Sequence, residues 1–132
     1  MMRDMLDAIR VLFVEDDAAT LNGYAAYLSG QGCDVIPVRT GHDALTMAQT
    51  TKFDVVVLDL GLPDVDGWEV ARHLKASAAT AQVPVIALTG ADLPHERVSA
   101  MRAGCDRYLV KPCAPTDLLN MIHRTARPAP TA

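Results

Sequence analysis

The sequence predicts an α/β protein with a doubly wound, five-stranded parallel sheet and helices on both faces. Short apolar runs alternate with longer segments of helical periodicity, five of each along the chain. The central run, residues 55–58, is consecutively apolar and mostly β-branched, which is typical of a strand buried on both faces. Helical connections between parallel strands make right-handed crossovers, so helices are expected on both sides of the sheet.

The length and composition of the chain indicate one globular domain. A chain of 132 residues can bury roughly two-thirds of its unfolded surface, and half of these residues are apolar. Residues 10–127 form the expected domain, with an N-terminal extension at 1–9 and a short tail or linker stub at 128–132. The net charge of −4, without a basic stripe, argues against direct nucleic-acid binding.

The chain is expected to act in the cytoplasm and not in a membrane. Acidic residues interrupt the N-terminal segment where a signal peptide would need an apolar core, and no apolar run reaches the length of a membrane span. The three cysteines lack the CxxC spacing of zinc and redox sites, so they are expected to be reduced.

Four of the five expected strands are followed by, or end in, a polar side chain. The strands are predicted at residues 11–14, 34–38, 55–59, 83–88 and 107–110. Glu15 and Asp16 follow the first strand, Asp59 ends the third, Thr89 follows the fourth and Lys111 follows the fifth. The second strand instead contains Pro37, which cannot donate a hydrogen bond to a neighbouring strand and therefore fits the edge of the sheet.

The helices are predicted from apolar side chains at helical spacing. Their buried sides are expected to carry Leu21, Tyr24, Ala25 and Leu28; Ala44, Leu45, Met47 and Ala48; Trp68, Val70, Ala71 and Leu74; Val98 and Met101; and Leu118, Leu119 and Ile122. Gly23 lies within the first helix at a cost of up to about 1 kcal/mol relative to alanine. Nothing in the sequence explains this glycine.

The polar strand ends are expected to form one site, because the carboxyl ends of parallel strands lie at the same edge of a sheet. Glu15, Asp16 and Asp59 offer hard oxygen ligands for Mg²⁺, and their close approach requires a counter-charge. Lys111 and the Thr89 hydroxyl can hold phosphate oxygens. An aspartate in such surroundings is suited to be the nucleophile in phosphoryl transfer, with an acyl phosphate on Asp59 as the product.

Four sequence segments, in this order, resemble the receiver domain of two-component response regulators, the CheY-like proteins. They are Val14-Glu15-Asp16-Asp17; Asp59-Leu60-Gly61-Leu62-Pro63 with Asp66-Gly67; Thr89-Gly90; and Tyr108-Leu109-Val110-Lys111-Pro112. The resemblance covers about residues 10–127. It implies the strand order 2-1-3-4-5 and a role in two-component phosphorelay signalling.

The resemblance also implies a role for each matching residue in the site. Asp59 would accept a phosphoryl group from the phosphohistidine of a sensor histidine kinase or a histidine phosphotransfer protein. Asp16 would bind Mg²⁺ directly and Glu15 would assist through water, while Asp59 and the main-chain carbonyl of Gly61 would complete the protein ligands. Lys111 would pair with Asp59 or its phosphate, and its peptide bond to the following proline would be cis.

Thr89 and Tyr108 would form the switch of such a domain. Thr89 would move toward the phosphoryl oxygen, and Tyr108 would turn from exposed to buried. A downstream protein target would recognise the change at the face formed by the fourth helix, the fifth strand and the fifth helix. The domain would be a monomer or a phosphorylation-dependent dimer.

A receiver domain is expected not to be an enzyme on a separate substrate, because it catalyses only its own phosphorylation and dephosphorylation. Side chains two positions after the phosphoacceptor and after the switch threonine influence dephosphorylation in this family. Here those positions hold Gly61 and Ala91, neither of which can position a water molecule. The resemblance therefore predicts a phosphoryl group that is not rapidly self-hydrolysed.

Two other functions use parts of the same pattern. Aspartyl-nucleophile phosphatases of the haloacid dehalogenase type also place an aspartate after an apolar strand, but need a second acid where this chain has Gly61. A receiver-like docking module would bind partners without turning over phosphate, and the complete set of polar strand-end residues argues against it. The chain could be a stand-alone regulator or the receiver of a hybrid histidine kinase, and the sequence leaves both open.

Overall fold

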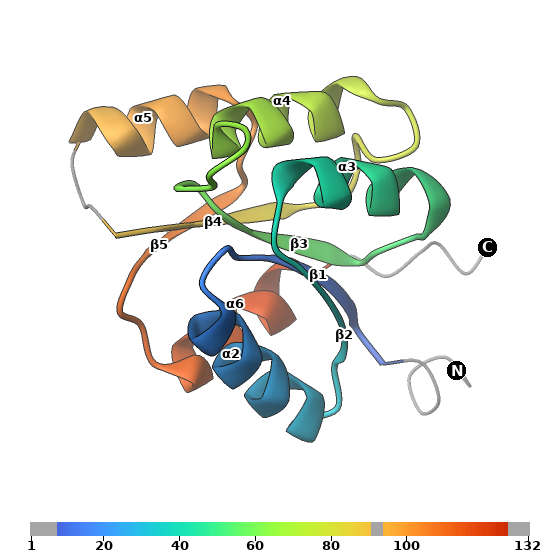
Figure 1. Cartoon of the computed structure of the whole chain (residues 1–132), viewed down its shortest axis with the longest axis vertical. Helices are drawn as coiled ribbons and strands as arrows, with labels where there is room; N and C mark the ends of the chain where they lie inside the picture. Colours follow the sequence, from blue (N-terminus) through green and yellow to red (C-terminus); the bar gives the residue numbers. More distant parts are fainter. Residues whose placement is uncertain (1–7, 91–93, 127–132) are drawn as a thin grey trace.

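The computed structural model describes residues 8–90 and 94–126, which form alternating strands and helices (Figure 1). In chain order these are β1 (Arg10–Val14), α2 (Ala18–Gly30), β2 (Asp34–Val38), α3 (Gly41–Thr50), β3 (Val55–Asp59), α4 (Gly67–Ala76), β4 (Val85–Thr89), α5 (Pro94–Arg102), β5 (Arg107–Val110) and α6 (Pro115–Thr125). The expected N-terminal extension and C-terminal tail lie almost entirely outside the described residues. No helix within these ranges is long and apolar enough to cross a membrane.

The strands form one parallel sheet in the order β2-β1-β3-β4-β5, which confirms the predicted doubly wound fold. β2 lies at the edge of the sheet, as its proline predicts. The register pairs Val14 with Leu58 and Thr89 with Val110. The strands therefore end at a similar level, and the residues that follow them meet at one edge.

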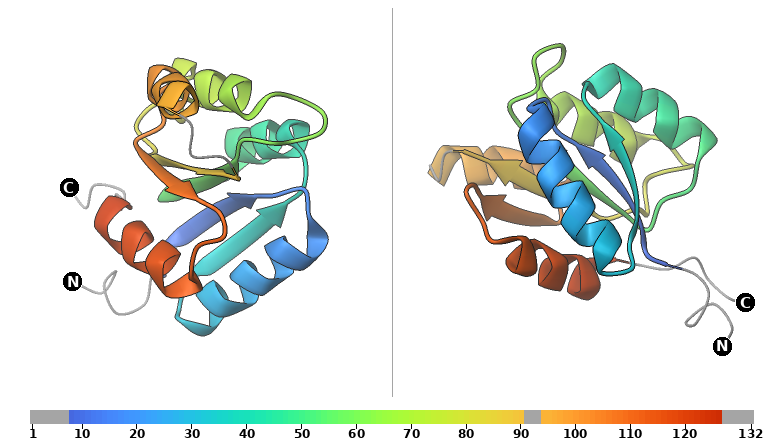
Figure 2. Two further views of the ribbon diagram at one scale, coloured as in Figure 1. Left: turned by 90° about the vertical axis from the view of Figure 1, so that its left-hand side faces the viewer. Right: turned by 60° about the horizontal axis from the view of Figure 1, so that its bottom comes forward.

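Helices cover both faces of the sheet, with α3, α4 and α5 on one face and α2 and α6 on the other (Figures 1 and 2). All five residues of β3 are consequently buried. The sheet separates two apolar clusters. The first includes Leu12, Val14, Val56, Leu58, Val70, Leu74 and Ala100, and the second includes Val11, Phe13, Leu21, Leu28, Val57, Leu118 and Ile122.

α5 packs on the sheet through small side chains, and the prediction for this helix was wrong. Val98 and Met101, expected to face inward, are 48% and 50% exposed. The buried side chains are Ala100 and, just after the helix, Ala103. The apolar pattern favours the largest residues for the buried side, whereas the helix turns its alanines to the sheet. Two large apolar side chains are thereby left on the surface of α5.

Candidate functional site

Lys111 joins the ends of three strands at the carboxyl edge of the sheet. Its Nζ lies 3.0 Å from Oε1 of Glu15, which directly follows β1, and 3.6 Å from Oδ1 of Asp59, the last residue of β3. Lys111 itself follows β5. Three of the residues that the sequence predicts for the site are therefore in contact, although they are far apart along the chain.

The two carboxylates are buried, and this sets their electrostatics. Glu15 is 1% exposed and Asp59 is 6% exposed. Burial, followed by the hydrogen-bonded and charged neighbour Asp59, raises the pKa of Glu15, although the ammonium of Lys111 opposes the shift. Burial alone would lower the pKa of Lys111, but its contacts with both carboxylates outweigh that effect and raise it. One lysine thus serves two buried acids.

Local hydrogen bonds hold each acid in place. The second oxygen of Glu15, Oε2, accepts a hydrogen bond from the N–H of Asp17 at 3.1 Å, and Asp17 in turn caps α2 through the N–H of Thr20. Oδ1 of Asp59 accepts from the N–H of Gly61 at 3.2 Å. The acidic loop after β1 is therefore tied to α2, and Asp59 is tied to the loop that follows its own strand.

Thr89 lies beside this cluster, and Tyr108 lies in β5, the strand that leads to Lys111. Thr89 ends β4 and is buried, and its carbonyl accepts a hydrogen bond from the N–H of Lys111 at 2.6 Å. Tyr108 is half-buried in β5, and the guanidinium of Arg97 from α5 lies 4.7 Å from the centre of its ring. The Lys111–Pro112 peptide bond is cis, as expected.

The donor atoms of the site fit a hard divalent cation in chemistry and in charge. Glu15 and Asp59 offer carboxylate oxygens. Their two buried negative charges share one positive charge, the ammonium of Lys111, so a cation would balance the remaining negative charge. In the described part of the chain, however, no three His, Cys, Asp or Glu side chains lie close enough together to hold a metal ion. Asp16, which is half-buried, is thus not gathered with the other two acids into such a cluster.

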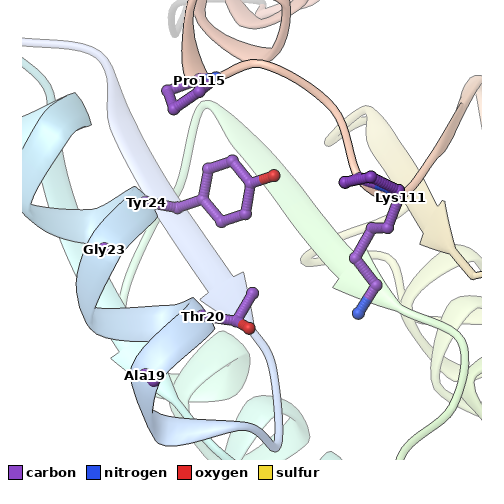
Figure 3. Close-up of a pocket in the computed structure, with 7 residues that line it drawn as sticks. Ala19, Thr20, Gly23, Tyr24, Lys111 and Pro115 are labelled. Atoms are coloured by element: carbon purple, nitrogen blue, oxygen red, sulfur yellow. The ribbon is translucent and has the colours of Figure 1, made fainter.

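A pocket of about 540 Å³ adjoins the site between α2 and the segment after β5. Figure 3 shows the Tyr24 ring extending from α2 across this pocket and the Lys111 side chain on its far wall. The remaining lining residues are Ala19, Thr20, Gly23, Pro112 and Pro115. Lys111, which contacts Glu15 and Asp59, therefore lines this pocket, although neither acid does.

Tyr24 and Gly23 are two of the pocket residues that sequence reasoning did not assign to the site. The Tyr24 hydroxyl donates to the carbonyl of Cys113 at 2.6 Å, and burial raises the pKa of Tyr24 to about 12. A Cβ at Gly23 would find no atom within 4 Å, so the fold does not require this glycine. The unexplained glycine within a helix was the one signal in the sequence that pointed to this surface.

Gly61, whose carbonyl is an expected metal ligand, lies beside the Asp59 carboxylate. Gly61 is exposed, and of the atoms around it only Asp59 Oδ1 would lie within 4 Å of an added Cβ, at 3.9 Å. A side chain at position 61 would therefore extend beside the Asp59 carboxylate. Ala91, the second residue of the expectation on phosphoryl lifetime, lies outside the described residues.

Comparison with known proteins agrees with this architecture over most of the chain. A family model described as the response regulator receiver domain matches residues 11–123. The response regulator MprA of Mycolicibacterium vanbaalenii is 38% identical over 111 residues, which are 84% of this chain and 47% of that protein. The chain thus spans about half the length of the curated relatives it matches.

Solved structures of receiver domains superpose closely on the fold. The chemotaxis response regulator CheY4 of Vibrio cholerae is 27% identical, with a TM-score of 0.85 over 89% of this chain and 98% of that chain. The receiver domain of sensor histidine kinase PA1611 from Pseudomonas aeruginosa, which has a magnesium ion coordinated in its active site cleft, is 30% identical, with a TM-score of 0.83 over 89% of this chain and 97% of that chain. The chain therefore belongs to the family of response regulator receiver domains of two-component systems.

Proposed function

We propose that Asp59 is the phosphoacceptor of this receiver domain. The observation that carries the proposal is the contact of Lys111 with both Glu15 and Asp59 at the carboxyl edge of the sheet. A buried carboxylate beside a second acid and a lysine can act as the nucleophile toward a phosphoryl group. The lysine ammonium and a bound metal ion would hold the oxygens of that group. A docking module that never turns over phosphate would have no need for this arrangement.

The transfer is a displacement at phosphorus. An oxygen of the Asp59 carboxylate attacks phosphorus while the bond to the imidazole nitrogen of a phosphohistidine breaks, and the electron pair of that bond remains on the nitrogen. The product is an acyl phosphate at position 59. Lys111, already 3.6 Å from Asp59 Oδ1, is close enough to pair with the negative charge that the phosphoryl group brings. The domain would catalyse only the phosphorylation and dephosphorylation of its own Asp59.

Mg²⁺ is the cation we propose for the site. Asp59, the main-chain carbonyl of Gly61 and, through water, Glu15 would hold it, and Asp16, which is not clustered with the other two acids in this structure, would join them as a direct ligand when the ion binds. When bound, it supplies the charge that two buried acids and the incoming phosphoryl oxygens need beyond the single ammonium of Lys111. The magnesium ion in the active site cleft of the related PA1611 receiver supports this choice.

Thr89 and Tyr108 are the proposed switch. Thr89 lies at the end of β4, next to Lys111, and can turn its hydroxyl toward a phosphoryl oxygen on Asp59. Tyr108 is half-buried, and the Arg97 guanidinium lies over its ring. If the ring turned into the core, it would lose the contact with Arg97 and bury more apolar surface. The readout is a change at the face formed by α5, β5 and α6.

We propose two surfaces for partner proteins. The phosphohistidine of a sensor histidine kinase or a histidine phosphotransfer protein would reach Asp59 along the pocket beside Lys111, where Gly23 adds no side chain. A downstream protein target would bind the α5 side, where Val98 and Met101 are exposed. We propose that the domain acts in the cytoplasm, as a monomer or a phosphorylation-dependent dimer, alone or within a hybrid histidine kinase.

The test is the intact mass of the protein after incubation with acetyl phosphate and Mg²⁺, for wild type and Asp59→Asn. Wild type is expected to gain one phosphoryl group, and this gain should disappear in EDTA and in the variant. A folded wild-type protein that gains no mass would support the docking module instead. An equal gain on both proteins would move the phosphoacceptor away from Asp59.

A further inference from the structure

The carboxylate of Asp64, in the loop between β3 and α4, is bonded to the first turn of α3. Its Oδ1 accepts a hydrogen bond from the N–H of Gly41 at 2.9 Å, and its Oδ2 accepts from the N–H of His42 at 3.0 Å. The next N–H, that of Asp43, donates to Oγ1 of Thr40 at 3.0 Å. Asp64 and Thr40 together satisfy three amides that have no partner within the helix.

In addition to the hydrogen bonds of Asp64, close packing at Gly41 holds the β3–α4 loop against α3. A Cβ at Gly41 would overlap the side chain of Val65 and lie 2.9 Å from Cγ2 of Val70, so the two backbones can approach only because residue 41 is glycine. At the far end of the loop, the N–H of Gly67 donates to the carbonyl of Leu60 at 3.3 Å. A Cβ at Gly67 would lie 2.6 Å from Leu60 Cα. The loop is therefore fixed at Asp64 and Val65 and closed at its ends.

The path from Asp64 back to the site is short and stiff. Leu62 is 9% exposed and packs in the core, and Pro63 has a fixed φ angle. Gly61 comes next, and its N–H donates to Asp59 Oδ1 at 3.2 Å. Asp64 is therefore joined to the Gly61 peptide, which bonds Asp59, by only two residues, and both of these have restricted freedom.

We propose that Asp64 is a positioning residue for the cation site. By fixing the β3–α4 loop to α3, it holds the carbonyl of Gly61 where a cation beside Asp59 can use it. The inference rests on the proposed function, because it assigns the Gly61 carbonyl to Mg²⁺. Groups that hold a metal donor in place typically change metal affinity by about 10- to 100-fold when they are removed.

The first measurement is the Mg²⁺ affinity of the full chain, by isothermal titration calorimetry, for wild type, Asp64→Ala, Asp64→Asn and Thr40→Ala. Thr40→Ala is the matched control, because it removes an amide acceptor from the same turn of α3 and leaves the loop bonded. Asp64→Ala is expected to weaken Mg²⁺ binding about tenfold, whereas Thr40→Ala should stay within about twofold of wild type. Asp64→Asn, which keeps one acceptor oxygen, should fall between them.

The second measurement needs no metal. Amide hydrogen exchange followed by NMR should be faster at Gly61 in Asp64→Ala than in Thr40→Ala, because only the first variant frees the loop. At saturating Mg²⁺, the rate of phosphorylation of Asp64→Ala by acetyl phosphate should return to that of wild type. Failure of the two variants to differ in Mg²⁺ affinity and in Gly61 exchange would show a merely structural role and overturn the proposal.

The outcomes separate this proposal from the proposed function. If wild type binds Mg²⁺ and the variants differ as expected but no protein is phosphorylated, the positioning role of Asp64 stands and the phosphoacceptor role of Asp59 fails. If wild type binds no Mg²⁺, the cation site fails and the role of Asp64 is overturned with it. If wild type is phosphorylated and Asp64→Ala binds Mg²⁺ as tightly as wild type, only the role of Asp64 is overturned.

Discussion

The carboxyl edge of the sheet has two sides that are held in different ways. The acid side consists of the ends of β1 and β3 with the loops that follow them, and the switch side consists of the ends of β4 and β5 with α5. On the acid side, Asp17 caps α2, Asp64 caps α3 and Asp66 caps α4. On the switch side, α5 is held to the sheet by the small side chains of Ala100 and Ala103.

The buried side chains of two neighbouring helices show the size of this difference. α4 buries Val70, Ala71 and Leu74, whereas α5 itself buries Ala100 and leaves its larger apolar side chains exposed. Each CH₂ group that is not buried forgoes about 0.8 kcal/mol of stabilisation. The proposed phosphoryl-transfer chemistry thus lies on the side where the loops are bonded to the helices, and α5, the helix expected to change on phosphorylation, buries smaller apolar side chains than α4.

The largest expected effect comes from Lys111→Met. This change leaves two buried carboxylates without a cation, so the free energy of unfolding should fall by about 3 kcal/mol. The rate of phosphorylation by acetyl phosphate should fall by about 100-fold or more, because the charge that meets the phosphoryl group is lost. Urea denaturation and intact-mass time courses measure the two effects.

Lys75→Met is the matched control for this substitution. The Lys75 and Lys111 side chains are 22% and 24% exposed, and Lys75 also pairs with one acid, Asp106, but away from the site. Lys75→Met should lower stability and leave the rate of phosphorylation close to that of wild type. A similar loss of rate in both variants would mean that Lys111 acts only through stability.

The second effect is a loss of stability at high pH, caused by ionisation of Tyr24. The hydroxyl of Tyr24 joins α2 to the segment after β5 by its hydrogen bond to Cys113. The pKa of Tyr24 is about 12 in the folded protein, above its ordinary value of about 10. A raised pKa stabilises the fold below pH 10, and this contribution is lost as the pH rises toward 12. Wild type should lose about 1 to 2 kcal/mol in that window, and Tyr24→Phe should show a smaller slope. Equal slopes, measured by urea denaturation from pH 9 to 12 at about one-unit steps, would contradict this role.

A smaller effect is expected at Gly23, on the pocket wall. Gly23→Ala should raise the free energy of unfolding by about 0.5 to 1 kcal/mol, because the new Cβ meets no other atom and alanine favours the helix. Gly23→Leu should leave the phosphorylation rate with acetyl phosphate unchanged and slow phosphotransfer from a histidine phosphotransfer protein. If both donors react at wild-type rates with Gly23→Leu, the pocket is not the docking surface of the donor.

The smallest expected effect on stability lies on the switch side. Arg97→Ala removes the cation over the Tyr108 ring and, because Arg97 is exposed, should cost only about 0.5 kcal/mol of stability. Its effect on the switch should be clearer, because the unphosphorylated protein no longer favours the outer position of the ring. Proton NMR of the Tyr108 ring should then show a shift toward the phosphorylated position before acetyl phosphate is added. An unchanged ring spectrum would remove Arg97 from the switch.

The sequence was sufficient to predict the architecture and the contact among three residues of the candidate site, because both depend on where the strands end. Consecutive apolar residues identify the buried strands, and parallel pairing gathers whatever follows them, which is how Glu15, Asp59 and Lys111 were found. The edge position of the proline-containing strand also follows from a local rule.

The remaining features depend on contacts between segments whose relative placement no local pattern encodes. The bond from Tyr24 to Cys113 joins α2 to the segment after β5, and the bonds from Asp64 to Gly41 and His42 join a loop to α3. The orientation of α5 was predicted wrongly because alanine carries little weight in an apolar pattern, although its size suits close packing on a sheet.

The position of the phosphoryl group in the phosphorylated protein decides whether Asp59 is the phosphoacceptor. Wild type phosphorylated with acetyl phosphate and Mg²⁺ is reduced with borohydride, which converts an aspartyl phosphate to homoserine, and the peptides are then sequenced by mass spectrometry. Homoserine is expected at position 59 and at no other aspartate, and none is expected when EDTA replaces Mg²⁺. Homoserine at another aspartate, or an intact Asp59 in protein that carries a phosphoryl group, would contradict this role of Asp59.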